Sequence, residues 1–145
     1  MKPREVEVLL VDDNPADVDL TREALQAGGH AVHLLTARDG MEAMAHLRQQ
    51  GSDSPVELVV LDLNLPRMDG RAVLSAIRKD ETFRKTPVVI FTTSQAARDI
   101  KLSYELGANC YVSKPGNLTD FMAAIDALAR FWLKFVSLPL RGPNG

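Results

Sequence analysis

Short apolar runs alternate with amphipathic segments along most of the chain. Five runs have the length and the branched side chains of buried strands: Val6–Val11, His30–Ala37, Leu58–Leu61, Val88–Phe91 and Cys110–Val112. After each run, apolar residues recur at steps of three and four, which is typical of a helix with one buried face. The alternation predicts an α/β fold, in which five parallel strands form a doubly wound sheet and each strand is followed by a helix.

Capping residues mark where the first helix begins and ends. Asn14 is a good N-cap, Pro15 suits the first helical position, and Asp17 in the first turn interacts favourably with the helix dipole. Gly28 and Gly29 end the apolar stripe of this helix. The first strand is therefore expected to lead directly into a helix.

The last predicted helix has the widest apolar face. Its apolar residues recur at helical spacing from Leu118 to Val136, and Phe131 and Phe135 widen the stripe toward the C-terminus. Either the sheet edge or a folded-back Leu138–Leu140 segment covers these rings, or another subunit or partner does. Residues 141–145 are expected to form a flexible tail.

Composition excludes several classes of protein. A single cysteine rules out an internal disulfide framework and, without a partner at ligand spacing, argues against a zinc site. A net charge of −2 with interspersed signs argues against nucleic-acid binding. The acidic N-terminal segment is unlike a signal peptide, and no apolar segment approaches the ~20 residues of a membrane helix. We expect a cytoplasmic protein that does not bind membranes.

Groups that can bind a charged oxygen stand at the ends of four predicted strands. They are Asp12 with Asp13, Asp62, Thr92 and Lys114. Because the carboxyl ends of parallel strands lie along one edge of a sheet, these side chains are expected to meet. Asp62 alone could equally cap the turn that follows it, since Asp often begins turns. The expected convergence favours a functional site.

The residue types at this edge indicate a particular chemistry. Three neighbouring carboxylates repel one another and stay ionised only with a cation among them, and oxygen ligands without histidine or cysteine select Mg²⁺. Asp62 could then attack a phosphoryl group while Lys114 and the Thr92 hydroxyl bind other oxygens of that group. The pattern predicts Mg²⁺-dependent phosphoryl transfer.

Over roughly residues 5–130 the chain resembles the receiver domain of bacterial two-component response regulators. The resemblance rests on Asp12-Asp13, on Leu-Asp-Leu-Asn-Leu-Pro-x-Met-Asp-Gly around Asp62, on Thr92, and on Tyr111-x-x-Lys114-Pro115. It implies the flavodoxin-like (βα)5 receiver fold for residues 5–130. Residues 131–145 would then be a C-terminal extension formed by the apolar helix end and the tail.

The resemblance also implies roles for the site residues. Asp62 would accept a phosphoryl group from a phosphohistidine of a sensor histidine kinase, and Lys114 would pair with the phosphate. Asp13, Asp62 and the backbone carbonyl of Asn64 would bind Mg²⁺, with Asp12 acting through water. A cis peptide bond before Pro115 would direct the Lys114 ammonium inward.

A switch and a mode of output follow from the same resemblance. On phosphorylation, Thr92 would move toward the phosphoryl group and Tyr111 into the vacated space, repacking the surface of the fourth helix, fifth strand and fifth helix. With no output domain in the sequence, we expect binding to read the signal. A homodimer is expected through that surface and the C-terminal extension, with Phe131, Trp132 and Phe135 as interface candidates. No enzymatic activity is expected beyond the protein's own phosphorylation and dephosphorylation.

A narrower resemblance is to the single-domain regulators of phytochrome-type histidine kinases. It rests on Leu-Asn-Leu-Pro after Asp62 and on three further segments: Thr92-Thr93-Ser94, Ser103–Leu106 and Phe131–Leu133. Thr93, where Ala is common in the family, and Gly116, where an apolar residue is frequent, depart from the family pattern. These departures leave the lifetime of the phosphate open.

Three other interpretations are weaker. A Mg²⁺-dependent phosphohydrolase would carry its nucleophile on the first strand and an acid two residues later, where this chain has Asn64. A flavodoxin-like FMN-binding module needs a Ser/Thr/Gly-rich phosphate loop, whereas Asp12-Asp13-Asn14-Pro15 would repel phosphate. A receiver that no longer takes phosphate and acts as a protein-binding module is opposed by the intact acidic and switch residues.

Overall fold

The computed structural model describes residues 4–50 and 55–139 and confirms the predicted alternation of strands and helices. The strands are β1 (Val6–Val11), β2 (Val32–Ala37), β3 (Leu58–Leu61), β4 (Val88–Thr92) and β5 (Cys110–Ser113). The helices are α1 (Pro15–Ala27), α2 (Gly40–Gln50), α3 (Gly70–Lys79), α4 (Ala97–Glu105) and α5 (Leu118–Ala129), followed by a π-helix, η1 (Arg130–Phe135).

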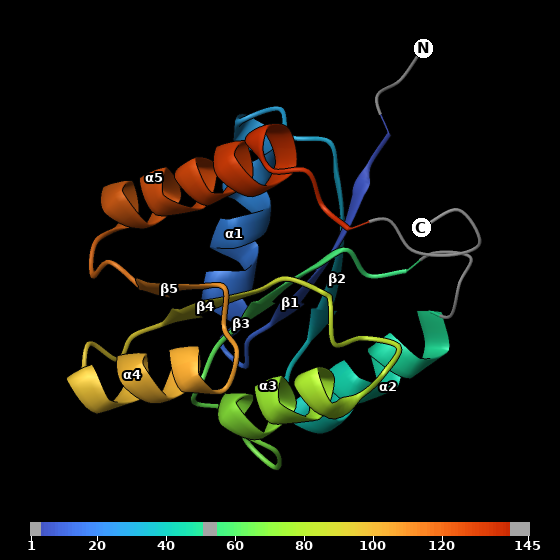
Figure 1. The fold of residues 1–145 in the computed structure, drawn as a ribbon. Coiled ribbons are helices and arrows are strands. Elements are labelled where there is room, and N and C mark those ends of the chain that lie inside the picture. The colour runs from blue at the N-terminus through green and yellow to red at the C-terminus, as the bar shows by residue number, and fades with distance from the viewer. Residues whose placement is uncertain (1–3, 51–54, 140–145) are drawn as a thin grey trace.

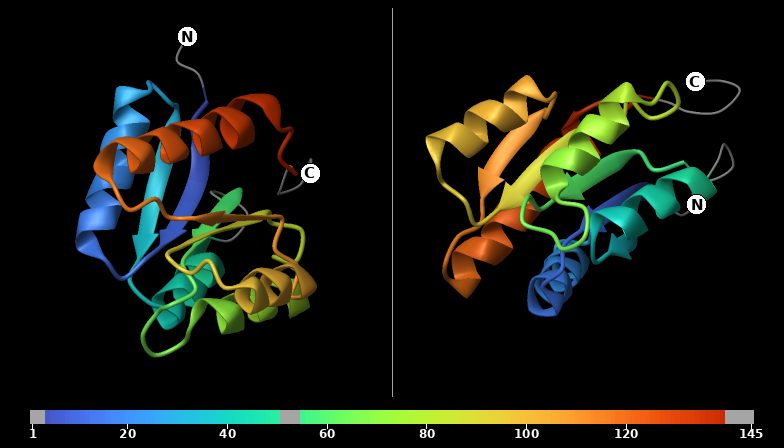
Figure 2. Two further views of the ribbon diagram at one scale, coloured as in Figure 1. Left: turned by 90° about the vertical axis from the view of Figure 1, so that its left-hand side faces the viewer. Right: turned by 90° about the horizontal axis from the view of Figure 1, so that it is seen from below.

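All five strands are parallel and form one sheet in the order β2-β1-β3-β4-β5. Helices α1 and α5 cover one face, and α2, α3 and α4 cover the other (Figures 1 and 2). Every strand therefore ends at the same edge of the sheet, as the alternating pattern predicted.

The two faces of the sheet pack into separate parts of the core. Leu9 and Leu61 point toward α2 and α3 and belong to the larger apolar cluster. Ile90 of β4 belongs to the same cluster, and the next residue, Phe91, points the other way and packs edge-on against Phe121 of α5, with ring centroids 5.3 Å apart. Burial on both faces explains why the strand sequences are continuous apolar runs rather than alternating ones.

The predicted N-cap of the first helix is present, and a second cap begins α3. The Asn14 side chain accepts hydrogen bonds from the backbone at the start of α1, and Asp69 caps α3 by accepting from the Ala72 N–H at 3.1 Å. At Gly70 a Cβ atom would overlap the backbone carbonyl of Asp62, so only glycine allows α3 to begin this close to β3. This contact fixes the loop that follows Asp62.

The helical region extends past residue 130, but its last turns are π-helical rather than α-helical. Neighbouring aromatic rings of this segment lie in different environments. Trp132 is 8% exposed and packs on the sheet, whereas Phe131 is 54% exposed and Phe135 is 79% exposed. Leu138 folds back against the Trp132 cluster but leaves both phenylalanines open, and the predicted tail, residues 141–145, lies outside the described residues.

Candidate functional site at the carboxyl edge of the sheet

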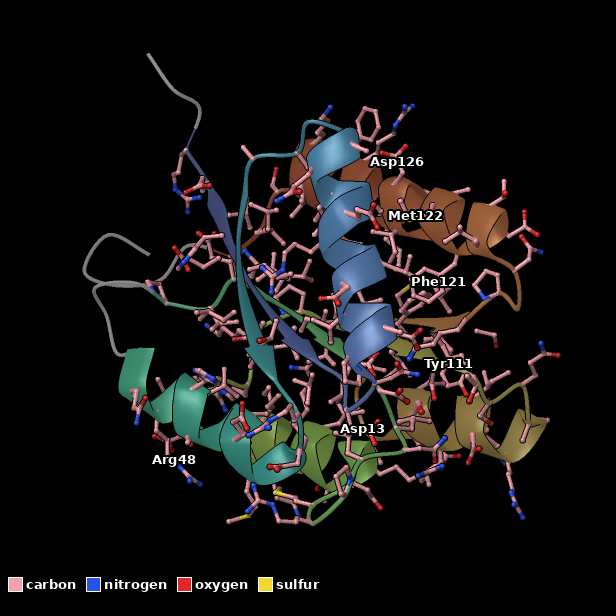
Figure 3. All side chains as sticks on the ribbon, turned by 180° about the vertical axis from the view of Figure 1, so that it is seen from behind. Asp13, Arg48, Tyr111, Phe121, Met122 and Asp126 are labelled. Atoms are coloured by element: carbon pink, nitrogen blue, oxygen red, sulfur yellow. The ribbon has the colours of Figure 1, made fainter. Side chains whose placement is uncertain are left out.

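The predicted convergence of the strand ends is confirmed. Asp12, Asp13 and Asp62 bring carboxylate oxygens within 4.8 Å of one another. Asp12, Asp62, Thr92 and Lys114 are each at least nine-tenths buried, whereas Asp13 is exposed just past β1, beside the beginning of α1 (Figure 3). The site therefore has a buried floor and one carboxylate that faces solvent.

Lys114 is the centre of this cluster. Its Nζ donates hydrogen bonds to Asp12 Oδ2 at 2.7 Å, to Asp17 Oδ2 at 2.8 Å and to Asp62 Oδ2 at 3.0 Å. Burial alone would lower the pKa of Lys114, but its hydrogen bonds to Asp12 and Asp17 and the charges of Asp12 and Asp62 outweigh burial and raise that pKa. The ammonium is therefore charged at neutral pH.

Asp62 is held from both sides. Its Oδ1 accepts from the Thr92 hydroxyl at 2.8 Å and from the Asn64 backbone N–H at 3.2 Å, while its Oδ2 faces Lys114. Asp12 is fixed similarly, because its Oδ1 accepts from the Asn14 N–H at 2.9 Å. Burial raises the pKa of Asp12, although the hydrogen bond from Lys114 opposes that rise. Both carboxylates have fixed orientations.

Asp17 belongs to the cluster, although the sequence analysis placed it only in the first turn of a helix. It reaches Lys114 because α1 begins directly at the end of β1 and turns the side chain of Asp17 back toward the sheet edge. The available signal was its position, an acid one helical turn past a strand that ends in two further acids. A second missed pair is Asp39 with Arg67, which joins the start of α2 to the loop after β3.

The donor set fits a divalent cation. Asp12, Asp13 and Asp62 supply hard oxygen atoms at close range, and Asp13 is open to solvent. A divalent cation held there would cancel negative charge on the carboxylates and on an incoming phosphoryl group. Asn64 is exposed two residues past Asp62, and the role of its carbonyl stays a prediction.

Tyr111 links β5 to the loop before α4 (Figure 3). Its hydroxyl donates to the Ser94 carbonyl at 3.0 Å, and the Ser113 hydroxyl donates to the same carbonyl at 3.1 Å. Ser94 in turn donates to Asp99 of α4 at 2.6 Å. Tyr111 is thus half-buried and tied to the loop that follows Thr92, and its movement on phosphorylation stays a prediction.

The predicted cis bond before Pro115 is wrong, and Trp132 offers little exposed surface for the predicted interface. The structure has no cis peptide bond within residues 4–50 and 55–139, so the bond before Pro115 is trans. Lys114 reaches three carboxylates from this trans backbone, which leaves no geometric need for the less favourable isomer. Trp132 packs into the chain's own core, because burying its large ring on the sheet removes apolar surface from water, and little of the ring is left exposed for the predicted interface.

Comparisons with known proteins show which family the chain resembles. The family model for the response regulator receiver domain matches residues 8–126. The chain is 44% identical over 135 residues to the response regulator Rcp1 of Synechocystis sp. (strain ATCC 27184 / PCC 6803 / Kazusa), covering 91% of this chain and 92% of that protein.

Solved structures show the same likeness. The phosphorylated cyanobacterial phytochrome response regulator RcpA superposes with a TM-score of 0.87 at 43% identity, covering 93% of this chain and 99% of that one. The Mn²⁺-bound form of Rcp1 gives 0.85 at 43% identity, with 94% and 99% covered. Among the described residues of this chain, no helix has the length and apolar character needed to cross a membrane. With the matching family model and relatives of this identity and coverage, the chain belongs to the response regulator receiver domain family.

Proposed function

We propose that the chain is a single-domain response regulator in which Asp62 accepts a phosphoryl group from a phosphohistidine of a sensor histidine kinase. The observation that carries this proposal is the position of the Asp62 carboxylate. It lies between the Thr92 hydroxyl and the Lys114 ammonium, beside two further carboxylates suited to a divalent cation.

The residues around Asp62 divide the work of transfer. A carboxylate oxygen of Asp62 forms a bond to phosphorus as the bond from phosphorus to the kinase imidazole nitrogen breaks, and the electron pair stays on that nitrogen. The Lys114 ammonium neutralises the charge on one phosphoryl oxygen, and the Thr92 hydroxyl donates a hydrogen bond to another. Asp13, Asp62 and the Asn64 carbonyl would bind Mg²⁺, and Asp12 would act through water. The protein catalyses nothing beyond its own phosphorylation and dephosphorylation.

Phosphorylation would be signalled to a partner by a change in the shape of the protein's surface. In this structure Thr92 donates to Asp62 itself, and phosphorylation would redirect that hydroxyl to a phosphoryl oxygen. The loop after β4 would follow, and its Ser94 carbonyl currently holds Tyr111 and Ser113. Movement of this loop would repack α4, β5 and α5, the surface that we propose for a homodimer together with Phe131 and Phe135. Similarity to Rcp1 and RcpA supports a phytochrome-type kinase as the partner.

Phosphate labelling tests the proposal. Wild-type protein with Mg²⁺ and acetyl phosphate, or with a phosphorylated histidine kinase, should gain one acid-labile phosphate, and Asp62→Asn should gain none. Asp19→Asn removes a charge from exposed α1 surface and should label like wild type. Label retained by Asp62→Asn would contradict the role of Asp62, and an unlabelled wild type would favour a receiver that acts only as a binding module.

A further inference from the structure

Asp17 makes a contact that the roles above leave unexplained. It is the third carboxylate on Lys114, and it comes from α1 rather than from a strand end. A lysine ammonium has three N–H donors. Because Asp12, Asp17 and Asp62 each accept one hydrogen bond, no donor of Lys114 is free for a phosphoryl oxygen.

We propose that Asp17 is a positioning residue that holds Lys114 in the unphosphorylated protein and releases it when a phosphoryl group arrives on Asp62. This inference rests on the proposed function. It makes Asp17 a competitor of the phosphoryl group for the same ammonium, and so a residue that sets how readily the phosphorylated state forms.

Burial identifies Asp17 as the contact that breaks. In the three ion pairs of Lys114, the side chains of Asp12 and Asp62 are 4% and 9% exposed, and that of Asp17 is 20% exposed. A more exposed carboxylate regains water at lower cost when it loses a partner. The first turn of α1 also stabilises a free carboxylate through the helix dipole. Asp12 has neither advantage, and Asp62 carries the phosphoryl group itself.

The negative charge of Asp17 also disfavours the phosphorylated state, as does its use of a Lys114 hydrogen-bond donor. A phosphoryl group on Asp62 adds negative charge beside Asp12, Asp13 and Asp17, and like charges at close range disfavour one another. Removing the charge of Asp17 therefore both weakens the hydrogen bond that occupies a Lys114 donor and lowers the repulsion. The phosphorylated state should form more readily without Asp17.

The test uses Asp17→Asn, which keeps the shape of the side chain, with Asp19→Asn as the matched control. Asp19 lies on the same helix turn, is exposed, and makes no ion pair within residues 4–50 and 55–139. The probe is beryllofluoride, a non-covalent phosphoryl analogue, added with Mg²⁺ to the full chain and followed by NMR. Asp17→Asn should bind it about three- to tenfold more tightly than wild type, the fold-change expected for one partly exposed ion pair.

A second readout separates this role from a structural one. Asp17→Asn should also label faster with acetyl phosphate, Asp17→Glu should restore slower labelling, and the urea midpoint should change little. Equal affinity in Asp17→Asn and wild type overturns the inference, as does an equal gain in Asp19→Asn, which would mean charge acting at a distance. If wild type binds no beryllofluoride and takes no label, the proposed function itself fails; if wild type responds and Asp17→Asn matches it, only this inference fails.

Discussion

The carboxyl edge of the sheet and the end of the C-terminal helix are opposites. At the edge, charged groups are buried: Asp12, Asp62 and Lys114 are each at least nine-tenths buried, and each has a partner. At the helix end, large apolar rings are exposed, with Phe135 at 79%. Each arrangement reverses the usual placement of its residue type.

The difference separates residues that contacts within the chain stabilise from residues that such contacts leave exposed. Buried charges persist only where several elements hold them against partners of opposite charge. Contacts within the chain therefore determine how the charged groups at the sheet edge are arranged. Exposed rings cost the folded chain little, and the proposed dimer would cover them. Trp132 and Phe131 are neighbours in the sequence, yet Trp132 is buried in the core and Phe131 is exposed.

Removing Lys114 should have the largest effect on stability. Lys114→Met leaves Asp12 and Asp62 buried without their cation, which should cost about 3–5 kcal/mol of unfolding free energy in the absence of divalent metal. Urea denaturation measures this. Lys101→Met removes an exposed lysine with a 3.9 Å pair to Glu105 and should change stability by less than ~0.5 kcal/mol. A Lys114→Met protein as stable as wild type would show that the cluster is not held by charge.

Trp132 should matter next. Trp132→Ala removes a buried ring from the sheet face and should cost about 3 kcal/mol in urea denaturation. Trp132→Phe should cost less, about 1 kcal/mol, because the indole Nε1 has no hydrogen-bond partner among the described residues and only volume is lost. Equal losses in the two variants would mean that the indole nitrogen, rather than packing, fixes this ring.

The exposed rings should affect association rather than folding. The double variant Phe131→Ser, Phe135→Ser should change the free energy of unfolding by less than ~0.5 kcal/mol per site, because both side chains already contact water. Equilibrium sedimentation at micromolar concentration should show the wild type as a dimer and the variant as a monomer. A monomeric wild type, with and without phosphorylation, would rule out the proposed dimer.

The smallest effect should come from the ion pairs of Asp126, near the C-terminal end of α5. Asp126 accepts from His30 at 2.8 Å and pairs with Arg130 at 3.1 Å, and the hydrogen bond from His30 is the main cause that lowers the pKa of Asp126 below 3.8. A carboxyl whose pKa is lower in the folded state stabilises the fold at any pH above its pKa in the unfolded state. This stabilisation is lost as the pH falls through its pKa in the folded state.

Comparing wild type with Asp126→Asn across pH tests this ion pair. The difference between their urea midpoints should be constant at neutral pH and should shrink as the pH falls below 3.8, the unfolded value. Asp19 makes no ion pair with any residue that the structure describes, so Asp19→Asn should show no such change. A difference that stays constant down to acid pH would mean that the charge of Asp126 does not contribute.

Local patterns in the sequence predicted most of the fold. Apolar runs and helical spacing predicted five strands and five helices, and Asn14 was recognisable as an N-cap. These features depend on residues a few positions apart, so a single sequence reveals them. The same reasoning brought Asp12, Asp13, Asp62, Thr92 and Lys114 to one edge, because a parallel sheet leaves no other place for its strand ends.

Other features were decided only by tertiary structure. Asp17 joins the cluster because the direction of α1 over the sheet turns its side chain toward Lys114, and no spacing rule fixes that direction. Trp132 packs against β1, β3 and β4 from the π-helix after Ala129, and the bond before Pro115 is trans, and no local pattern in the sequence predicted either feature. The sequence by itself determined the order of the elements and the chemistry at their ends, since both follow from neighbouring residues. Which donors and acceptors meet was settled by packing between distant segments, where a shift of about 1 Å makes or breaks a hydrogen bond.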